Sequence, residues 1–199
     1  MKDDRLKQQI NFILETDRLK SIYRRTYLAD GARFENDAEH SWHLSLMAIL
    51  LAEYSNSSID ILKVVKMVII HDIIEIDAGD AYCYDAAANE GKAEREMAAA
   101  ERLFSLLPPD QKEELMLTWQ EFEKNETAEA KFANALDRFQ PVNLNFASDG
   151  KSWKENSITY DQVIKRNSVI KSGSNKLWDY AKKIIDSAVT KSYIKHRGE

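Results

Sequence analysis

A single cysteine, Cys83, occurs among the 199 residues of the chain. One cysteine cannot form an intramolecular disulfide or a cysteine-based zinc site, so both are excluded. Glycine and proline are also scarce, with six and three residues, and no period-2 pattern of apolar residues persists. Helical spacing dominates instead, which predicts an all-α fold.

Long basic runs and long apolar runs are missing as well. The net charge is −5 at pH 7, so no nucleic-acid polymer is expected as a partner, although a small anionic substrate is compatible with this charge. The charged segment 1–5 has no apolar core of the kind that signal peptides carry. The most apolar run, 64–76, contains four charged or titratable side chains and is too short to cross a bilayer. We therefore expect a cytoplasmic protein without a membrane partner.

What is present is an ordinary globular composition, with 44% apolar and 31% charged residues, in a length that suits one domain. No repeat or linker divides the chain, so we expect a single helical-bundle domain over residues 1–199. Its metal core would span about 36–141, and C-terminal helices at 159–195 would pack on it. The expected helices lie at about 3–20, 38–54, 59–78 and 90–107, from Pro109 and from 127 onward, and at 159–171 and 174–193.

Local signals set several of the expected helix ends. Asn36 or Asp37 is the expected N-cap of the helix at 38–54, and Gly79 is a plausible stop for the helix at 59–78. Pro141 cannot donate a backbone hydrogen bond to the carbonyl of Asp137, so a kink or a helix end is expected there.

The most informative feature is the pair His71-Asp72, which lies within the apolar stretch 64–74. A buried carboxylate is costly unless its charge is compensated, and a metal ion compensates it because carboxylates and neutral imidazoles are both metal ligands. His40 upstream and Asp137 downstream complete an ordered four-ligand set on three expected helices, as in other helical-bundle metal sites. Two imidazoles and two carboxylates suit one divalent ion such as Mn²⁺, Co²⁺, Fe²⁺, Ni²⁺, Zn²⁺ or Mg²⁺.

Other interpretations of these residues stay open. A lone histidine on an apolar helix is more often a hydrogen-bonded core residue than a ligand, but an adjacent buried aspartate also needs a partner. Glu75 lies four residues after His71 and shares its helix face, so it is either a general acid or base or half of a salt bridge. Asp80 either orients a substrate hydroxyl or caps a turn. His43, three residues after His40, is expected to support the site or to pack in the core.

Three segments carry a resemblance to a known family: 35–42 (Glu-Asn-Asp-Ala-Glu-His-Ser-Trp), 71–80 (His-Asp-Ile-Ile-Glu-Ile-Asp-Ala-Gly-Asp) and 135–141 (Ala-Leu-Asp-Arg-Phe-Gln-Pro). Through them the sequence resembles the HD-domain metal-dependent phosphohydrolases over about residues 6–145. Within that family it looks like the subgroup of bacterial 5′-deoxynucleotidases and HD-domain-containing 2 proteins. The full ordered set is far more specific than the His-Asp dipeptide alone.

The resemblance implies an all-helical fold, a homodimer, a catalytic role for Glu75 and a place for Asp80 near the sugar and the leaving group. It also implies one divalent metal ion, held by His40, His71, Asp72 and Asp137.

An arginine ahead of the first histidine binds phosphate in the nucleotidase subgroup. Arg25 aligns with that arginine if the alignment contains no gap between it and His40. Arg33, which is closer to His40 in the sequence, is a second candidate for the phosphate-binding residue. Thr26 and Cys83 stand where the nucleotidases have an aromatic and a hydroxyl residue, and both positions bear on sugar and base recognition.

Uncatalysed phosphate-ester hydrolysis is extremely slow, and a divalent ion lowers the pKa of water and neutralises charge on phosphoryl oxygens. We therefore predict a metal-dependent phosphohydrolase that acts on a small-molecule nucleotide and releases inorganic phosphate from nucleoside, above all deoxynucleoside, 5′-monophosphates. Three alternatives are an HD-type hydrolase of a triphosphate, cyclic nucleotide or alarmone, a non-catalytic nucleotide-binding protein that retains the metal site, and a purely structural helical bundle.

Overall fold

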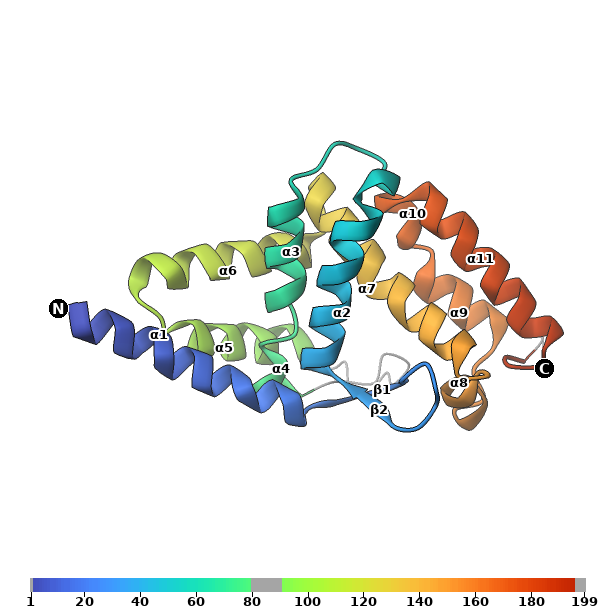
Figure 1. The fold of residues 1–199 in the computed structure, drawn as a ribbon, viewed down its shortest axis with the longest axis horizontal. Coiled ribbons are helices and arrows are strands. Elements are labelled where there is room, and N and C mark those ends of the chain that lie inside the picture. Colours follow the sequence, from blue (N-terminus) through green and yellow to red (C-terminus); the bar gives the residue numbers. More distant parts are fainter. Residues whose placement is uncertain (1, 80–90, 196–199) are drawn as a thin grey trace.

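Helices make up nearly all of the regular structure in the computed structural model, which describes residues 2–79 and 91–195 (Figure 1). The first of these two stretches contains α1 (Lys2–Thr16), the 3₁₀ helix η1 (Asp17–Ser21), β1 (Tyr23–Tyr27), β2 (Phe34–Asn36), α2 (Asp37–Leu51), the 3₁₀ helix η2 (Ala52–Tyr54), α3 (Ile61–Ile70) and α4 (Glu75–Ala78). The second contains α5 (Lys92–Phe104), α6 (Pro109–Lys124), α7 (Ala128–Ala147), α8 (Lys151–Glu155), α9 (Tyr160–Asn167), α10 (Ile170–Gly173) and α11 (Asn175–Thr190). The predicted all-α class is confirmed, with one small sheet added.

Helix α7 organises the arrangement, because α2, α3, α6, α10 and α11 all pack against it. The apolar core consists of two clusters. The first surrounds α7 and includes the fully buried Phe132 and Leu136, and the second lies among α1, α4, α5 and α6 and includes Phe104. Helix α3 contributes to both, with Met67 in the first cluster and Ile70 in the second. The residues that follow Ile70 therefore emerge where the two clusters meet.

Several expected helix ends are confirmed. Asn36 caps α2 by accepting a hydrogen bond from the backbone of Glu39, whose own side chain accepts one from the backbone of Asn36, which is a reciprocal capping box. Pro109 occupies the first turn of α6, and Gly79 ends α4 with a φ of +74°, a conformation that favours glycine. The sequence thus sets where these helices begin and end.

The expected continuous helix at 59–78 is wrong in its middle. Helix α3 ends at Ile70, a turn covers 71–74, and α4 begins at Glu75. Ile73 donates its backbone hydrogen bond to Ile70, three residues back and 3.1 Å away, and such i to i+3 bonds tighten the chain. His71 itself keeps helical backbone angles, with φ −58° and ψ −40°, and its Nε2 still lies 3.1 Å from Oδ1 of Asp72.

The helix end expected at Pro141 is also wrong, since α7 continues to Ala147, and the alternative of a kink there stays a prediction. Proline inside a helix costs about 3 kcal/mol. Val142 and Leu144 lie beyond it and are buried in the molecule, and each buried side chain of this kind contributes about 1.5–3 kcal/mol. The Asn145 side chain donates 2.8 Å to the Pro141 carbonyl. Packing therefore offsets the cost of the proline.

A two-stranded antiparallel sheet between β1 and β2 is the element that sequence reasoning missed. Tyr23 pairs with Asn36 and Tyr27 with Phe34, and the rings of Tyr27 and Phe34 stack with centroids 4.3 Å apart. Side chains alternate between the two faces of a strand, so this sheet decides which of its charged residues face the interior.

Two further differences concern the C-terminal half. The expected helix at 159–171 is divided into α9 and α10, and the short helix α8 was not expected. Within residues 2–79 and 91–195, no helix is both long enough and apolar enough to cross a membrane.

Candidate functional site

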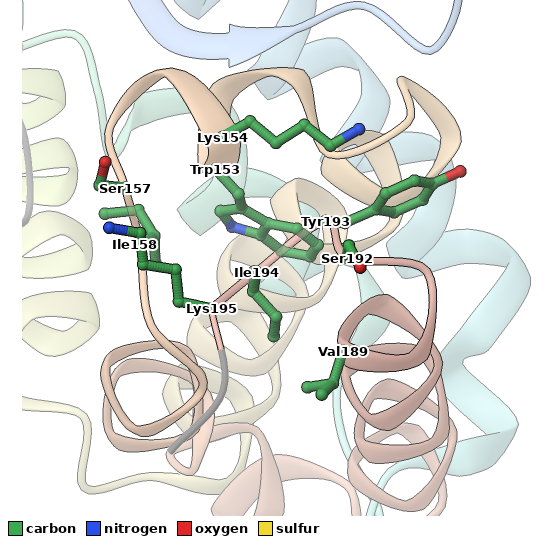
Figure 2. A pocket seen from close by; sticks show the side chains of 9 residues that line it. All are labelled: Trp153, Lys154, Ser157, Ile158, Val189, Ser192, Tyr193, Ile194 and Lys195. Atoms are coloured by element: carbon green, nitrogen blue, oxygen red, sulfur yellow. The ribbon is translucent and has the colours of Figure 1, made fainter. Parts of the chain in front are cut away.

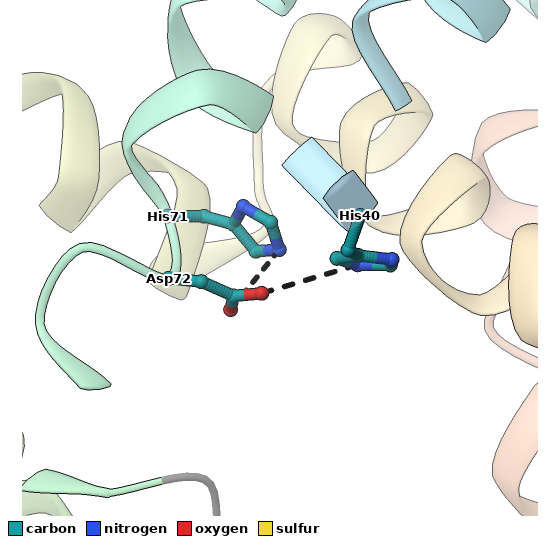
Figure 3. A group of neighbouring side chains, drawn as sticks. All are labelled: His40, His71 and Asp72. Atoms are coloured by element: carbon teal, nitrogen blue, oxygen red, sulfur yellow. Dashed lines mark ion pairs between the residues drawn. The ribbon is translucent and has the colours of Figure 1, made fainter. Parts of the chain in front are cut away.

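Three separate helical segments bring the four predicted metal ligands together. His40 lies in the first turn of α2, His71 and Asp72 lie in the turn after α3, and Asp137 lies in the middle of α7. All four are buried, with exposed fractions between 0 and 7%. Figure 3 shows the Asp72 carboxylate joined by dashed lines to the ring of His71 and to the ring of His40.

The two histidines and the two aspartates lie at distances that leave room for one small cation among them. His40 Nε2 is 3.0 Å from Asp137 Oδ1 and 3.9 Å from Asp72 Oδ2. His71 Nε2 is 3.1 Å from Asp72 Oδ1 and 3.8 Å from Asp137 Oδ1. The metal-facing atoms of His40, His71 and Asp72 all lie within 4.8 Å of one another. His40, His71 and Asp72 therefore form a group that could share one ion, and Asp137 Oδ1 lies close to both imidazoles of that group.

His71 provides the test of whether a metal ion fits. Its Nδ1 lies 3.0 Å from the carbonyl oxygen of Val68, so Nδ1 carries the hydrogen and donates it, and Nε2 presents a lone pair. This Nε2 atom is buried and has no hydrogen-bond partner among the described residues. A lone pair that faces two carboxylates is unfavourable unless a cation lies between them, and a divalent ion of borderline or hard character suits this donor set.

The acidic surroundings change the pKa values of the ligands themselves. Burial and the charge of Arg24 lower the pKa of His40, but the hydrogen bond to Asp137 and the nearby carboxylates of Glu35 and Asp72 outweigh them and raise it to about 9. Burial raises the pKa of Asp137, but the charge of Arg138, the hydrogen bond from His40 and the proximity of His71 outweigh it and hold that pKa well below its ordinary value. The site is therefore built to hold positive charge.

Arg24, on β1, is a charged residue at this site that the sequence analysis did not single out. Its Nη1 lies 2.6 Å from Asp72 Oδ2 and 3.3 Å from Asp37 Oδ1, and only 13% of its side chain is exposed. Burial lowers its pKa, but the charges of Asp72, Asp137, Asp37 and Glu75 outweigh it and raise that pKa well above its ordinary value. Arg24 therefore keeps a permanent positive charge beside the predicted metal ligands.

The structure does not bring Arg25 or Arg33 to this site. Arg25 is the next residue on β1, and its side chain is exposed because successive side chains of a strand point to opposite faces. Arg33 is exposed and binds Glu39 with both guanidinium nitrogens, one of them at 2.8 Å. The strand-forming residues around Arg24, namely Tyr23, Thr26 and Tyr27, are the signal that could have separated the two arginines.

A cavity of about 330 Å³ opens beside the metal ligands. Glu75 reaches it from α4, and its carboxylate oxygen lies within 4.8 Å of those of Asp37 and Asp72. Asp80 and Cys83 lie outside the described residues. The residues that line the cavity are mostly polar or charged: Arg24, His71, Asp72, Ile74, Glu75, Lys92, Glu96, Phe122, Glu123, Asn134, Asp137, Arg138 and Arg166.

A second cavity of about 300 Å³ lies near the C-terminal end of α11 (Figure 2). Trp153 and Tyr193 lie among the residues that form it, together with Lys154 and Lys195. None of its lining residues is a histidine, an aspartate or a glutamate. This cavity therefore lacks the imidazole and carboxylate side chains that a site for a divalent metal ion uses.

Comparison with known proteins agrees with this geometry. A family model described as HD domain matches residues 16–178. The 5′-deoxynucleotidase HDDC2 of Xenopus laevis is 31% identical over 68% of this chain and 67% of its own length, and the human protein of the same name is 28% identical over 67% and 64%. A crystal structure of a predicted metal-dependent phosphohydrolase from Magnetospirillum magnetotacticum is 49% identical, covers 98% of this chain and 97% of its own, and superposes with a TM-score of 0.93.

Proposed function

This chain belongs to the HD domain family, and from that premise we propose that it releases inorganic phosphate from deoxynucleoside 5′-monophosphates. The observation that carries the proposal is the unsatisfied, buried Nε2 of His71, which faces two carboxylates at the edge of a polar cavity that also holds an arginine and a further glutamate. The names of the frog and human relatives support the choice of substrate.

The donor set assigns the cofactor and its chemistry. His40, His71, Asp72 and Asp137 would hold one divalent ion, which, when bound, neutralises charge on phosphoryl oxygens and makes water easier to deprotonate. Four protein ligands leave positions open on an octahedral ion.

Arg24 is proposed to bind the substrate phosphate. Its guanidinium lines the cavity next to Asp72, and an arginine can hold a phosphate through two parallel charge-assisted hydrogen bonds. A phosphate held by Arg24 in this position would lie next to Asp72, one of the predicted metal ligands.

Glu75 is proposed to move the proton. It lies one turn after Asp72 and reaches the same cavity, within the carboxylate group formed with Asp37 and Asp72. A carboxylate at this place can accept a proton from the attacking water or return one to the departing 5′ oxygen, a contribution of about 10²–10⁴-fold in rate. The products are a nucleoside and inorganic phosphate.

A phosphate-release assay over a panel of nucleotides tests the proposed function. The panel contains the four common deoxynucleoside 5′-monophosphates, their ribose counterparts, a deoxynucleoside 3′-monophosphate, a triphosphate and a cyclic nucleotide, each with Mn²⁺ or Co²⁺. We expect kcat/KM to be highest for the 5′-deoxynucleotides. Turnover confined to the triphosphate or the cyclic nucleotide would contradict the proposed substrate.

Arg24→Ala is expected to lower kcat/KM for the 5′-monophosphate by about 100-fold, mainly through KM, because two charge-assisted hydrogen bonds to the phosphate are lost. Metal affinity should be retained, since Arg24 is not a ligand. The matched control is Arg25→Ala, the same substitution one residue further on the exposed face of β1. Steady-state kinetics on both variants decide which arginine binds the phosphate. A larger fall in kcat/KM for Arg25→Ala than for Arg24→Ala would assign that role to Arg25.

We also propose a homodimer. Trp42, Leu46, Ile49 and Leu50 form one stripe on α2 and are 66, 39, 60 and 61% exposed, and monomeric proteins rarely leave a contiguous apolar patch uncovered. Sedimentation equilibrium should give twice the chain mass of 22.9 kDa, and Leu50→Glu should shift the protein to monomer. A wild-type mass of one chain would refute the dimer.

A further inference from the structure

A buried carboxylate that the proposed mechanism does not use lies directly behind the site. Glu35, on β2, is 1% exposed. A buried charge of this kind destabilises the fold unless it is paired and hydrogen-bonded. The partners of Glu35 are therefore expected to reveal its role.

The two carboxylate oxygens of Glu35 face three different side chains. Oε1 accepts a hydrogen bond of 2.6 Å from Nε2 of Gln140, which is also 1% exposed. Oε2 lies 3.4 Å from Nδ1 of His40 and 3.9 Å from Nε of Arg24. Neither Glu35 Oε2 nor Arg24 Nε has a hydrogen-bond partner among the described residues. The Glu35 carboxylate thus contacts both His40, a predicted metal ligand, and Arg24, the arginine proposed to bind the phosphate.

The hydrogens of this network can be arranged in one consistent way. Nε2 of His40 faces Asp137 and Asp72, so a ligating His40 keeps its lone pair on Nε2 and its hydrogen on Nδ1. Figure 3 shows this second ring nitrogen on the side away from Asp72. Its hydrogen-bond acceptor is Gln140 Oε1 at 3.2 Å, and Glu35 Oε2 lies 3.4 Å away as a charged neighbour. The Gln140 amide nitrogen uses its two hydrogens on Glu35 and on Nδ1 of His43, which also explains why His43 is present.

A carboxylate behind a ligating histidine fixes the tautomer and the orientation of the ring and makes it a stronger ligand. The same carboxylate faces the Nε edge of Arg24, while Nη1 of Arg24 is directed to Asp72. We propose that Glu35 is a positioning residue that orients His40 for the metal ion and Arg24 for the phosphate, and that Gln140 assists only the first of these tasks. This proposal rests on the proposed function for its Arg24 part alone.

Glu35→Gln tests the proposal because it keeps the size of the side chain and removes its charge. We expect the affinity for Mn²⁺, measured by isothermal titration calorimetry, to fall by about 10–100-fold. At saturating Mn²⁺, kcat should recover, whereas KM for the nucleotide should stay on the order of tenfold higher because Arg24 is no longer held. The absorption spectrum of bound Co²⁺ should change as well, since it reports the ligand geometry.

Gln140→Met separates the two tasks. It removes the acceptor behind His40 but no contact to Arg24, so metal affinity should fall while KM at saturating Mn²⁺ stays at the wild-type value. The matched control is Glu39→Gln, which lies on the same segment, pairs with the exposed Arg33 and can keep the capping box. It should leave metal affinity, Co²⁺ spectrum and KM unchanged.

Two results would overturn the proposal. One is wild-type Mn²⁺ affinity in both Glu35→Gln and Gln140→Met, with only a lower melting temperature, which would make the network purely structural. The other is weakened metal binding in Glu35→Gln with an unchanged KM, which would remove Arg24 from the role of Glu35. If the wild-type protein hydrolyses no nucleotide at all, the proposed function fails, yet the calorimetry and the Co²⁺ spectrum still decide the part that concerns His40.

Discussion

Asp72→Asn is expected to remove the metal ion and the activity together. Asp72 lies between His71 and His40, with its two oxygens 3.1 and 3.9 Å from their Nε2 atoms, and asparagine keeps the shape of this group without its charge. We expect a loss of metal affinity of about 100-fold or more and a fall in kcat of about 1,000-fold at limiting metal. The measurements are the metal content per chain after dialysis and the rate of phosphate release.

The control for this variant is Asp110→Asn. Asp110 is an exposed carboxylate whose partner is Arg5, 2.7 Å away, so the substitution removes a surface ion pair and touches no predicted metal ligand. It should retain both metal and activity. Because Arg24 loses a close partner in Asp72→Asn, circular dichroism should accompany the assay. A folded Asp72→Asn protein that turned over nucleotide at the wild-type rate would contradict a metal-dependent mechanism.

Glu75→Gln is expected to separate metal binding from catalysis. Glu75 lines the cavity but belongs to α4, beyond the turn that supplies His71 and Asp72. The glutamine cannot exchange a proton at neutral pH, so kcat should fall by about 10²–10⁴-fold while the metal content stays at the wild-type level. The same pair of measurements, metal content and phosphate release, is sufficient.

Asp77→Asn is the control on the same short helix. The Asp77 carboxylate binds Arg102, 2.9 Å away, and does not line the cavity, so this variant should keep its activity. Loss of metal in Glu75→Gln would instead identify Glu75 as a ligand. An unchanged kcat would exclude it from proton transfer.

Local sequence signals were sufficient for much of the helical framework. Asn36, Pro109 and Gly79 each act through their own chemistry, by a side-chain cap, a fixed φ or a positive φ, and the structure uses all three as expected. The proximity of the four predicted ligands could also be foreseen from the sequence. An aspartate buried without a partner in an apolar segment is costly, so Asp72 had to have a compensating group.

The structure differs from the sequence-based predictions where contacts between distant parts of the chain determine the local conformation. The apolar pattern through 64–74 favours an unbroken helix, but the chain turns after Ile70 at the junction of the two core clusters. Likewise, Pro141 is tolerated because the residues beyond it are buried against other helices. Neither effect is visible in a window of a few residues.

The arginine assignment shows the same limit in the site itself. Arg24 and Arg25 have the same side chain, and only the strand at Tyr23–Tyr27 gives them opposite directions. Glu35 and Gln140 lie 105 residues apart and meet through a hydrogen bond between β2 and α7. A single sequence offers no signal for such a pair, so the residues that support the metal ligands could be found only in the structure.

The most direct measurement is a titration of metal-free protein with Mn²⁺, in which bound metal and phosphate release from a deoxynucleoside 5′-monophosphate are followed in the same samples. If His40, His71, Asp72 and Asp137 hold the one ion on which hydrolysis depends, activity should start near zero, rise in proportion to bound metal and level off at one ion per chain. Full activity in the metal-free protein, or hydrolysis that rises while these four residues bind no ion, would contradict the account.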